Sequence, residues 1–367
     1  MIFYCTKDAL VVGVNTVFRA VSSKSTLPIL QGILLKTEAD RLILTATDLE
    51  ISIQCQVPVQ TIEEGSVVIP SRIFSEIVRK LPDTSIHIEL KDQQLYITYY
   101  SSNIVLKTLE QEEFPLLPNL EAAQAFSIPV SLFQNMIKQT VFACSSEEKR
   151  QVFTGLFMQI ENQTLTMVGT DTHRMAYKTT ELPEAENSTF SGIIPGKTLT
   201  EIYRLLRDDD ETVDIQYTES QVSFQFGAIH FLSRLIAGQF PNYKQVIPNT
   251  CETKIHMPVA AFTEAVERAS LISRDSALGA NIICLKLVES TLFLEQNSDV
   301  GRISEQLEVE AEGKEITISI NSKYLLDVLK VIDEQMVFEL SGPNQAGIIR
   351  PLNDPNYVYL VLPIRAS

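Results

Sequence analysis

Asp171 and His173 are the residues of this sequence that most readily suggest catalysis, because a carboxylate and an imidazole lie two positions apart. Such a pair can exchange protons with a substrate, but a hydrolase also needs a nucleophile or a metal ion. The sequence has no Gly-x-Ser-x-Gly turn, no phosphate-binding glycine-rich loop and no dinucleotide-binding glycine turn. Its four histidines form no metal-binding His-x-His or His-x-x-x-His pair. A hydrolase is therefore disfavoured, and we expect no catalytic site, no metal and no cofactor.

The cysteines also exclude several kinds of site. Their number is odd, no two lie within four positions of each other, and they are Cys5, Cys55, Cys144, Cys251 and Cys284. This spacing matches neither a zinc site nor a disulfide framework, and it favours reduced thiols. The first residues contain neither a basic segment nor a long apolar run. The sequence thus predicts a soluble, cytoplasmic protein without a signal peptide or a membrane span.

A second set of chemically active residues is basic and occurs as pairs seven positions apart. The pairs are Arg72 and Arg79, Lys197 and Arg204, and Lys323 and Lys330. Seven helical steps of 100° return to within about 20° of the start, so each pair would lie on one side of a helix. For any one pair, a solvated helix surface is the better explanation. Three pairs in the same register favour a shared task.

Acidic residues recur in the same register, at Glu76, Glu201 and Asp327. Each would lie about 40° around its helix from the first base. The whole chain has a formal net charge of −16. An acidic protein repels nucleic acid unless its bases are segregated onto one surface.

These charges belong to a segment that occurs three times, at residues 69–81, 194–206 and 320–332, with offsets of 125 and 126 positions. Such a repeat indicates a duplicated architecture. Each copy is typical of a strand end, a turn and an amphipathic helix with its apolar side opposite the bases. The apolar residues of the first copy are Ile73, Phe74, Ile77, Val78 and Leu81.

The remaining pattern repeats with the same period. Each third begins with a strand and a helix, and Asp8 is expected to cap the first of these helices. Phe-Pro joints at residues 114–115 and 240–241 separate the thirds. We predict an α+β fold of three repeated domains, 1–122, 123–250 and 251–367, each with two helices packed on antiparallel sheets. Edge strands near residues 103–108 and 299–310 are expected to stay unpaired within one chain and to pair with a second chain.

The complete chain resembles the bacterial DNA polymerase III beta subunit family, the sliding clamps. The resemblance rests on six motifs in order. They are residues 26–30 (Thr-Leu-Pro-Ile-Leu), 45–50 (Thr-Ala-Thr-Asp-Leu-Glu), 170–174 (Thr-Asp-Thr-His-Arg), 240–243 (Phe-Pro-Asn-Tyr), 321–329 (Asn-Ser-Lys-Tyr-Leu-Leu-Asp-Val-Leu) and 362–365 (Leu-Pro-Ile-Arg).

The resemblance implies a non-enzymatic processivity factor: a head-to-tail homodimer of six DNA-clamp domains that forms a ring around duplex DNA. Its helices would line the hole, and sequence-independent phosphate contacts would permit sliding. The repeated acids would limit the grip on DNA. The DNA-contacting residues that it implies are Lys24, Arg72, Arg79, Lys138, Arg150, Lys197, Arg204, Arg268, Lys323 and Lys330.

The resemblance further implies a peptide pocket between the second and third domains. It would bind a short linear motif carried by the DNA polymerase III alpha subunit, the clamp loader delta subunit and repair proteins. Thr172 stands where many relatives carry glycine. The implied pocket residues are Phe153, Gly155, Thr170, Thr172, His173, Arg174, Met175, Pro241, Val246, Asn321, Tyr324, Leu360, Leu362, Pro363, Ile364 and Arg365.

The dimer interface would combine the last strand of the first domain with the third domain, as an apolar centre with a charged rim. The residues expected there are Ile104, Leu106, Lys107, Leu271, Ile272, Glu305 and Glu308. A peptide-binding adaptor that never touches DNA is the third hypothesis, beside the clamp and the hydrolase. The three cation pairs argue against the adaptor, and retention on nicked plasmid DNA would decide.

Overall fold

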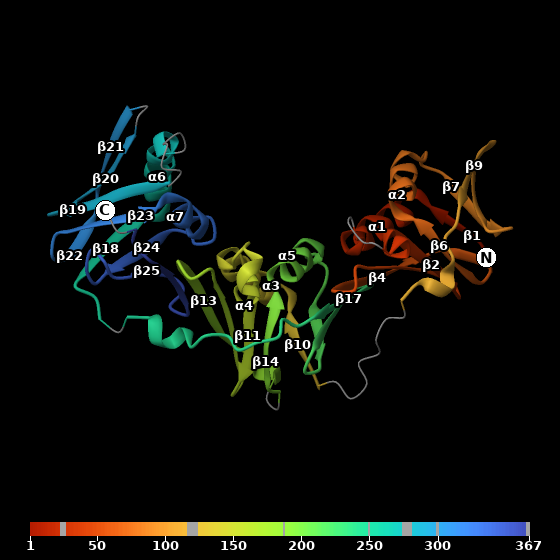
Figure 1. The fold of residues 1–367 in the computed structure, drawn as a ribbon, viewed down its shortest axis with the longest axis horizontal. Helices are drawn as coiled ribbons and strands as arrows, with labels where there is room; N and C mark the ends of the chain where they lie inside the picture. Colours follow the sequence, from red (N-terminus) through yellow and green to blue (C-terminus); the bar gives the residue numbers. More distant parts are fainter. Residues whose placement is uncertain are drawn as a thin grey trace. The chain divides into compact units, whose positions relative to one another are not determined.

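The computed structural model describes residues 1–22, 27–115, 124–185, 188–248, 250–273, 281–298 and 301–364, without the side chains of Glu184, Ile272 and Ser273. The chain divides into two compact units, one of residues 1–133 and 200–235, the other of residues 134–199 and 236–367. The middle third of the sequence therefore contributes to both units. Figure 1 shows the helices and strands of each unit.

The helices alternate with groups of strands along the chain. In the described residues the α-helices are α1 (Lys7–Val17), α2 (Ser71–Lys80), α3 (Val130–Thr140), α4 (Gln151–Thr154), α5 (Gly196–Leu205), α6 (Val259–Ser273) and α7 (Ser322–Leu329). The three copies of the repeated segment form α2, α5 and α7, as predicted. Each follows directly on a strand, so the strand–turn–helix interpretation is confirmed.

Two details of the predicted helices are wrong. Ile73 was expected on the apolar side of α2, but its side chain is 45% exposed, whereas Phe74 and Val78 are fully buried. Helix α2 therefore buries a narrower stripe than the sequence indicated. Asp8 lies in the first turn of α1, and the cap is Thr6, whose hydroxyl accepts a hydrogen bond from the amide of Ala9. A helix whose cap is two residues earlier leaves Asp8 near the positive end of the helix dipole, where its charge is still favourable.

The first unit contains two antiparallel sheets. The five-stranded sheet has the order β5 (Gln60–Glu63), β1 (Ile2–Thr6), β7 (Ser85–Lys91), β8 (Gln94–Tyr99) and β9 (Ser102–Lys107). The eight-stranded sheet has the order β10 (Gln124–Pro129), β15 (Thr212–Tyr217), β16 (Gln221–Phe226), β17 (Ile229–Arg234), β4 (Ile51–Pro58), β3 (Arg41–Thr47), β2 (Gly32–Glu38) and β6 (Gly65–Pro70). Helices α1 and α2 pack against each other beside these sheets.

The second unit contains a nine-stranded and a four-stranded sheet, again antiparallel. The larger has the order β14 (Phe190–Pro195), β11 (Gly155–Glu161), β12 (Thr164–Thr170), β13 (Arg174–Glu181), β26 (Tyr357–Val361), β25 (Gly347–Pro351), β24 (Gln335–Leu340), β18 (Thr253–Pro258) and β22 (Glu310–Gly313). The smaller has the order β21 (Gly301–Glu308), β20 (Thr291–Ser298), β19 (Ile282–Val288) and β23 (Ile316–Asn321).

The same strand pairing joins consecutive repeats in both units. In the first unit β4 pairs with β17, the last strand of the second repeat, and Cys55 lies opposite Ile229. In the second unit β13 pairs with β26, the last strand of the third repeat, and Arg174 lies opposite Val361. Backbone hydrogen bonding thus makes each joint a continuous sheet rather than a flexible linker. Strands β9 and β21 each end a sheet with one edge unpaired among the described residues.

A single apolar core runs through the third repeat and into the part of the second repeat that shares its unit. It includes Phe262 of α6, Leu325 of α7 and Tyr359 of β26, and it extends to Ala143 and Ala176.

All five cysteines are free thiols. Among the described residues no helix is long and apolar enough to cross a membrane.

Candidate functional site

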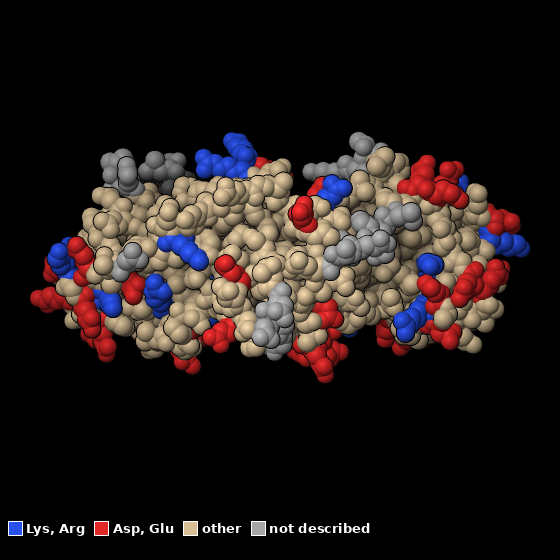
Figure 2. Space-filling view, turned by 90° about the horizontal axis from the view of Figure 1, so that it is seen from below, with Lys and Arg blue, Asp and Glu red and all other residues tan. Residues whose placement is uncertain are grey.

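The repeated bases are exposed, as an amphipathic helix requires. Arg72, Arg79, Lys197, Arg204, Lys323 and Lys330 are all exposed. The opposite sides of the same helices are buried, through Phe74 in α2, Ile202 in α5 and Leu325 in α7. The helices therefore fix where the cations project. Figure 2 shows one face of the molecule, on which acidic groups form patches among broad uncharged areas, in agreement with the net charge of −16.

The repeated acids differ in their surroundings. The Glu76 side chain is 58% exposed and contacts Arg72 at 3.6 Å between Oε1 and Nε. Glu201 is only 13% exposed, and it pairs with Arg204 at 2.7 Å and with Arg19. Arg19 was missed because it lies 182 positions away from Glu201 and has no repeated counterpart in the sequence pattern.

Asp327 is the third of these acids, and its side chain is 18% exposed. Its Oδ2 accepts a hydrogen bond from Nη1 of Arg174 at 2.7 Å, and its Oδ1 lies 3.6 Å from Nζ of Lys330. Asp327 therefore contacts one residue implied for the peptide pocket and one implied for DNA.

The remaining implied DNA contacts lie in different surroundings. Lys138 of α3 and Arg150, which directly precedes α4, are exposed. Arg268 of α6 is bound to Glu305 by two hydrogen bonds of 3.0 and 2.8 Å and lies 3.6 Å from Glu264. Hydrogen bonding to Arg268 lowers the pKa of Glu305. Arg268, expected at DNA, is thus bound to Glu305, expected at the dimer interface. Lys24, the last implied DNA contact, lies outside the described residues.

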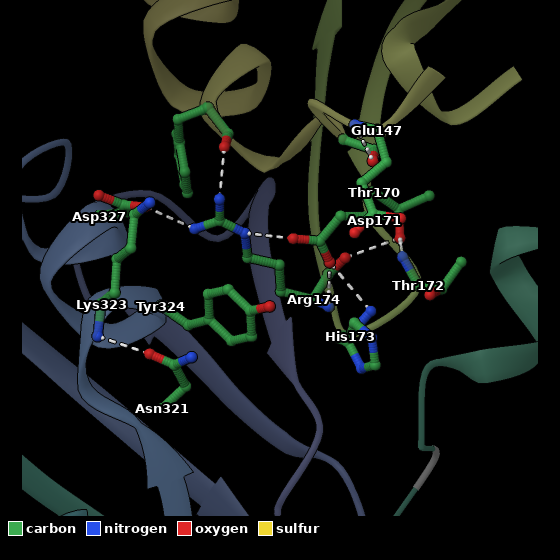
Figure 3. Close-up of polar contacts among 12 residues, drawn as sticks. Glu147, Thr170, Asp171, Thr172, His173, Arg174, Asn321, Lys323, Tyr324 and Asp327 are labelled. Atoms are coloured by element: carbon green, nitrogen blue, oxygen red, sulfur yellow. Dashed lines mark hydrogen bonds and ion pairs between the residues drawn. The ribbon is translucent and has the colours of Figure 1, made fainter. Parts of the chain in front are cut away.

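Arg174 is the centre of a polar network in the second unit (Figure 3). It is 7% exposed, although it carries a charge. Its guanidinium donates to Oδ2 of Asp171 at 3.0 Å, to Oδ2 of Asp327 at 2.7 Å and to the carbonyl of Phe142 at 2.8 Å. It also lies over the Tyr324 ring, 4.6 Å from the centroid. Burial disfavours the cation, but interactions with Tyr359, Asp327 and Asp171 outweigh it and raise the pKa of Arg174.

These contacts stabilise the orientation of α7 against the turn between β12 and β13. Hydrogen bonds to charged groups contribute about 1.5–3 kcal/mol each to stability. Two carboxylates and a carbonyl satisfy the buried guanidinium, so its desolvation is offset. Arg174 therefore connects the second and third repeats and also lines the candidate site.

Asp171 stabilises the turn rather than forming a catalytic pair. Its Oδ1 accepts hydrogen bonds from the backbone amides of His173 at 2.9 Å and Arg174 at 3.0 Å. Thr170 donates its hydroxyl to the carbonyl of Arg174 at 2.7 Å. Thr172 has a φ of 77°, the left-handed region in which a β-branched residue is an outlier and glycine is favoured. The carboxylate is thus used to hold the turn, which argues against a hydrolase.

A cavity of about 550 Å³ lies beside this network. It brings together residues that the sequence assigned to different sites. Those implied for DNA are Arg150 and Lys323, and those implied for the peptide pocket are Phe153, Thr172, His173, Arg174 and Tyr324. The cavity wall also includes Cys144, whose thiol pKa is raised to about 12 by burial.

Two other implied pocket residues, Met175 and Leu360, form part of a separate apolar surface on the opposite side of β13. They belong to a buried cluster with Val168 and Tyr243. Neighbouring residues alternate across a strand, so Arg174 faces the helices and Met175 the cluster. Phe153 links the two surfaces, because it lines the cavity and its ring lies 6.5 Å from that of Phe240.

Several residues of this apolar surface were missed by sequence reasoning. They are Phe157, Val168, Tyr177, Phe240, Tyr243, Ile247 and Ala346. The period of two along β13 could have identified Tyr177, which follows Met175 on the same side. The segment around residues 240–247 shows no such period, so its aromatic residues could be placed only by the structure.

Three of the remaining implied pocket residues are exposed. Val246 and Leu362 are exposed at 55% and 40%, and Pro241 is exposed as well. The amide of Leu362 donates to the carbonyl of His173 at 2.8 Å, and the amide of Ile364 donates to Ser319. Pro363 lies half-buried between them. Arg365 lies outside the described residues.

Two of the implied pocket residues have structural roles. Asn321 caps α7 by accepting from the amide of Lys323 at 3.0 Å. Gly155 is buried in β11, and a Cβ at this position would lie 2.5 Å from Ile193 and 2.7 Å from Ile236. Gly155 therefore allows close packing of β11 against Ile193 and Ile236.

The implied dimer residues lie on or near open sheet edges. Ile104 and Leu106 of β9 are half-buried and Lys107 is exposed. Leu271 near the end of α6 is 60% exposed, and Glu308 of β21 is exposed. The side chain of Ile272 lies outside the described part of the chain.

Comparisons with known proteins agree over the whole length of the chain. Models of the N-terminal, central and C-terminal domains of the DNA polymerase III beta subunit match residues 1–118, 127–242 and 244–365. The beta sliding clamp of Bacillus subtilis is 37% identical, and the alignment covers 100% of both chains. That of Staphylococcus epidermidis is 36% identical and covers 100% of this chain and 99% of the relative.

Solved structures show the same similarity. The DNA polymerase sliding clamp from Bacillus subtilis superimposes with a TM-score of 0.96 at 36% identity, with both chains covered completely. A sliding clamp from Pseudomonas aeruginosa bound to griselimycin gives a TM-score of 0.94 at 30% identity, again with complete coverage. The chain, an α+β protein of three clamp domains, belongs to the DNA polymerase III beta subunit family.

Proposed function

We propose that this protein is a sliding clamp, a non-catalytic processivity factor that encircles duplex DNA and tethers the replicative polymerase. The observation that carries the proposal is the match of three clamp domains over the entire chain. The exposed cation pairs on α2, α5 and α7 support it, because they offer phosphate contacts without base recognition. Weak contacts of this kind hold DNA while they permit movement along it.

The ring is proposed to be a head-to-tail homodimer of six domains, divided in each chain at residues 1–122, 123–250 and 251–367. Two of the three possible joints between repeats exist within one chain, as the pairings of β4 with β17 and of β13 with β26. Among the described residues β9, the last strand of the first repeat, and β21 of the third repeat each end a sheet, and they are the strands that a third joint of this kind would use. A second copy of the chain supplies that joint twice and closes the ring.

The partner site is proposed to combine the apolar cluster around Met175 with the polar rim at His173, which the buried Arg174 supports. An apolar pocket with a few fixed polar groups suits a short peptide with a leucine or phenylalanine anchor. The partners proposed are the DNA polymerase III alpha subunit, the clamp loader delta subunit and repair proteins, all in the bacterial cytoplasm.

Retention on circular DNA tests the clamp function. The protein loaded on nicked circular plasmid should remain bound during gel filtration and should be lost when the plasmid is linearised. Neutralising Arg72, Lys197 and Lys323 together to alanine removes one cation from each helix. We expect retention at about 0.1 M salt to fall several-fold, because phosphate contacts dominate such binding. Dimer mass should not change.

The matched control replaces three exposed lysines outside these helices, Lys36, Lys254 and Lys314, with alanine. Both variants lose the same charge, so only the helix variant should lose retention. Equal retention of the helix variant and the wild type would refute the DNA-facing assignment. Equal retention on circular and linear DNA would refute encirclement itself.

A labelled Gln-Leu-Ser-Leu-Phe peptide tests the partner site by fluorescence anisotropy. Met175→Ala removes apolar surface from the cluster, and we expect about tenfold weaker binding, since central apolar contacts contribute more than about 1 kcal/mol. Truncation after Leu362 removes the segment that Ile364 anchors to Ser319 and should also weaken binding. The control is Met336→Ala, the same change in the core of the third repeat. Unaltered binding by both site variants would refute the assignment.

A further inference from the structure

The repeated acid has the same type of environment in two of its three copies. Asp327 of α7 accepts a hydrogen bond from Arg174 and lies beside Lys330, the residue directly after this helix. Glu201 of α5 contacts Arg19 and, on its own helix, Arg204. In each case one carboxylate contacts an arginine of the preceding repeat and an exposed cation on, or directly after, its own helix. The acid stands at the same position of the repeat, whereas the two arginines do not, because Arg19 follows α1 and Arg174 begins β13.

Asp327 differs from Glu201 in what its arginine supports. Arg174 is the last residue of the turn at 170–174, whose residues Thr172 and His173 line the cavity. It is followed in β13 by Met175 of the apolar cluster. On the helix side its guanidinium lies against the ring of Tyr324 in α7. Asp327 binds Arg174 (Figure 3), and Arg174 stands between His173 of the polar rim and Met175 of the apolar surface. Asp327 therefore helps to position both residues.

Asp327 has a second contact, in which its other carboxylate oxygen lies beside the cation of Lys330. Lys330 is 69% exposed, and its ammonium lies 3.6 Å from Oδ1 of Asp327. A carboxylate at this distance competes with a phosphate for the lysine and repels the phosphate itself. The same negative charge therefore favours the arrangement of the partner site and opposes DNA contact at Lys330.

We propose that Asp327 is a positioning residue that links the two sites: it orders the partner cleft through Arg174 and restrains DNA binding by Lys330. The proposal rests on the proposed clamp function and assigns a role to one carboxylate within it. Removing the charge should have effects of opposite sign at the two sites. Peptide binding weakens because Arg174 keeps only one of its two carboxylates, and DNA retention increases because Lys330 is released.

The decisive variant is Asp327→Asn, which keeps the size of the side chain and removes its charge. We expect its affinity for the Gln-Leu-Ser-Leu-Phe peptide to fall about fivefold. Its residence on nicked circular plasmid should lengthen about twofold at low salt, and the difference should shrink as salt is raised. The matched control is Glu201→Gln, in which retention should increase likewise while peptide affinity stays at the wild-type value.

Two further variants separate the contacts. Lys330→Ala removes the DNA-facing partner of Asp327, so DNA retention should fall and peptide affinity should be unchanged. Asp327→Glu keeps the charge, so DNA retention should stay near the wild-type value, while the longer side chain misplaces Arg174 and weakens the peptide complex. This variant also serves if Asp327→Asn fails to fold.

Loss of both peptide affinity and DNA retention in Asp327→Asn would show a merely structural role and overturn the proposal. Unchanged peptide affinity in both Asp327 variants would overturn it as well. Wild-type protein and Met175→Ala are measured in parallel. If the wild type is not retained on circles, or if Met175→Ala binds the peptide normally, the proposed function itself fails; if both behave as expected, the failure concerns Asp327 alone.

Discussion

Arg174 shows how one residue can be chosen correctly from sequence while its environment is not foreseen. The motif at 170–174 identified it as part of a polar rim, where an exposed side chain is expected. The structure buries it among Asp171, Asp327 and the carbonyl of Phe142. Asp327 is 153 positions away from Arg174, so no local pattern could indicate the pair. From the sequence, Asp327 was identified only as one of three acids that recur at the same position of the repeated helix.

Thr172 is a residue whose unusual backbone was seen only in the structure. The resemblance implied glycine at this position, and here threonine has a φ of 77°. A residue held in a sparsely populated region costs about 1–3 kcal/mol. The hydrogen bonds of Asp171 to the neighbouring amides stabilise the turn in spite of this strain.

His230 carries a prediction about pH. It lies in β17, opposite Gln54 of β4, at the joint between the first and second repeats. Burial lowers its pKa below the ordinary value of 6.5. Above pH 6.5 the imidazole is neutral in the folded and the unfolded chain. As pH falls below 6.5 the unfolded chain binds the proton first, so the stability of the folded state decreases towards the lowered pKa.

Replacing His230 by glutamine removes this titration. Thermal unfolding of the wild type and of His230→Gln, followed between pH 8 and pH 5, should give a constant difference above about pH 7. Below about pH 6.5 the wild type should lose stability faster than the variant. Parallel pH profiles of the two proteins would show that His230 does not contribute.

At the scale of helices and strands, the repeated pattern carried most of the correct predictions. Helices α2, α5 and α7 were found because apolar residues and bases recur in one register across three copies. The strand β5 was not predicted, since Gln60–Glu63 is short and mostly exposed and shows no apolar alternation. Pairing with β1 forms this strand, so the decisive interaction is distant in sequence.

The candidate site was only partly predictable at the same scale. The sequence indicated one pocket, whereas β13 separates its residues into an apolar cluster on one side and a polar cavity on the other. The alternation of side chains along a strand explains the separation of Arg174 from Met175. The aromatic side chains of residues 240–247 reach the cluster from a segment without regular alternation. Their contribution follows from chain folding and not from a local pattern.

At the scale of the whole molecule, the predictions concern a second copy of the chain. Repeats are joined within the chain by the same antiparallel pairing each time, so β9 and β21, which each have one unpaired edge among the described residues, indicate where a further repeat would attach. Open edges attract unrelated strands unless they are covered. A homodimer covers both, and we expect light scattering at micromolar concentration to give twice the mass of one chain.

Leu271 provides the test of this interface. Its side chain is 60% exposed on α6, so Leu271→Asp should leave the fold of one chain intact. At an interface the same change replaces apolar contact by a desolvated charge, and we expect the dimer to dissociate at least about tenfold more readily. The control is Leu352→Asp, since Leu352 is 54% exposed in the same unit but lies away from β21 and α6, in the turn after β25. A monomeric wild type would contradict the dimer itself, and equal dimer masses for both variants would place the interface elsewhere. The reason is that closing the ring should bury the exposed apolar groups near the β9 and β21 edges.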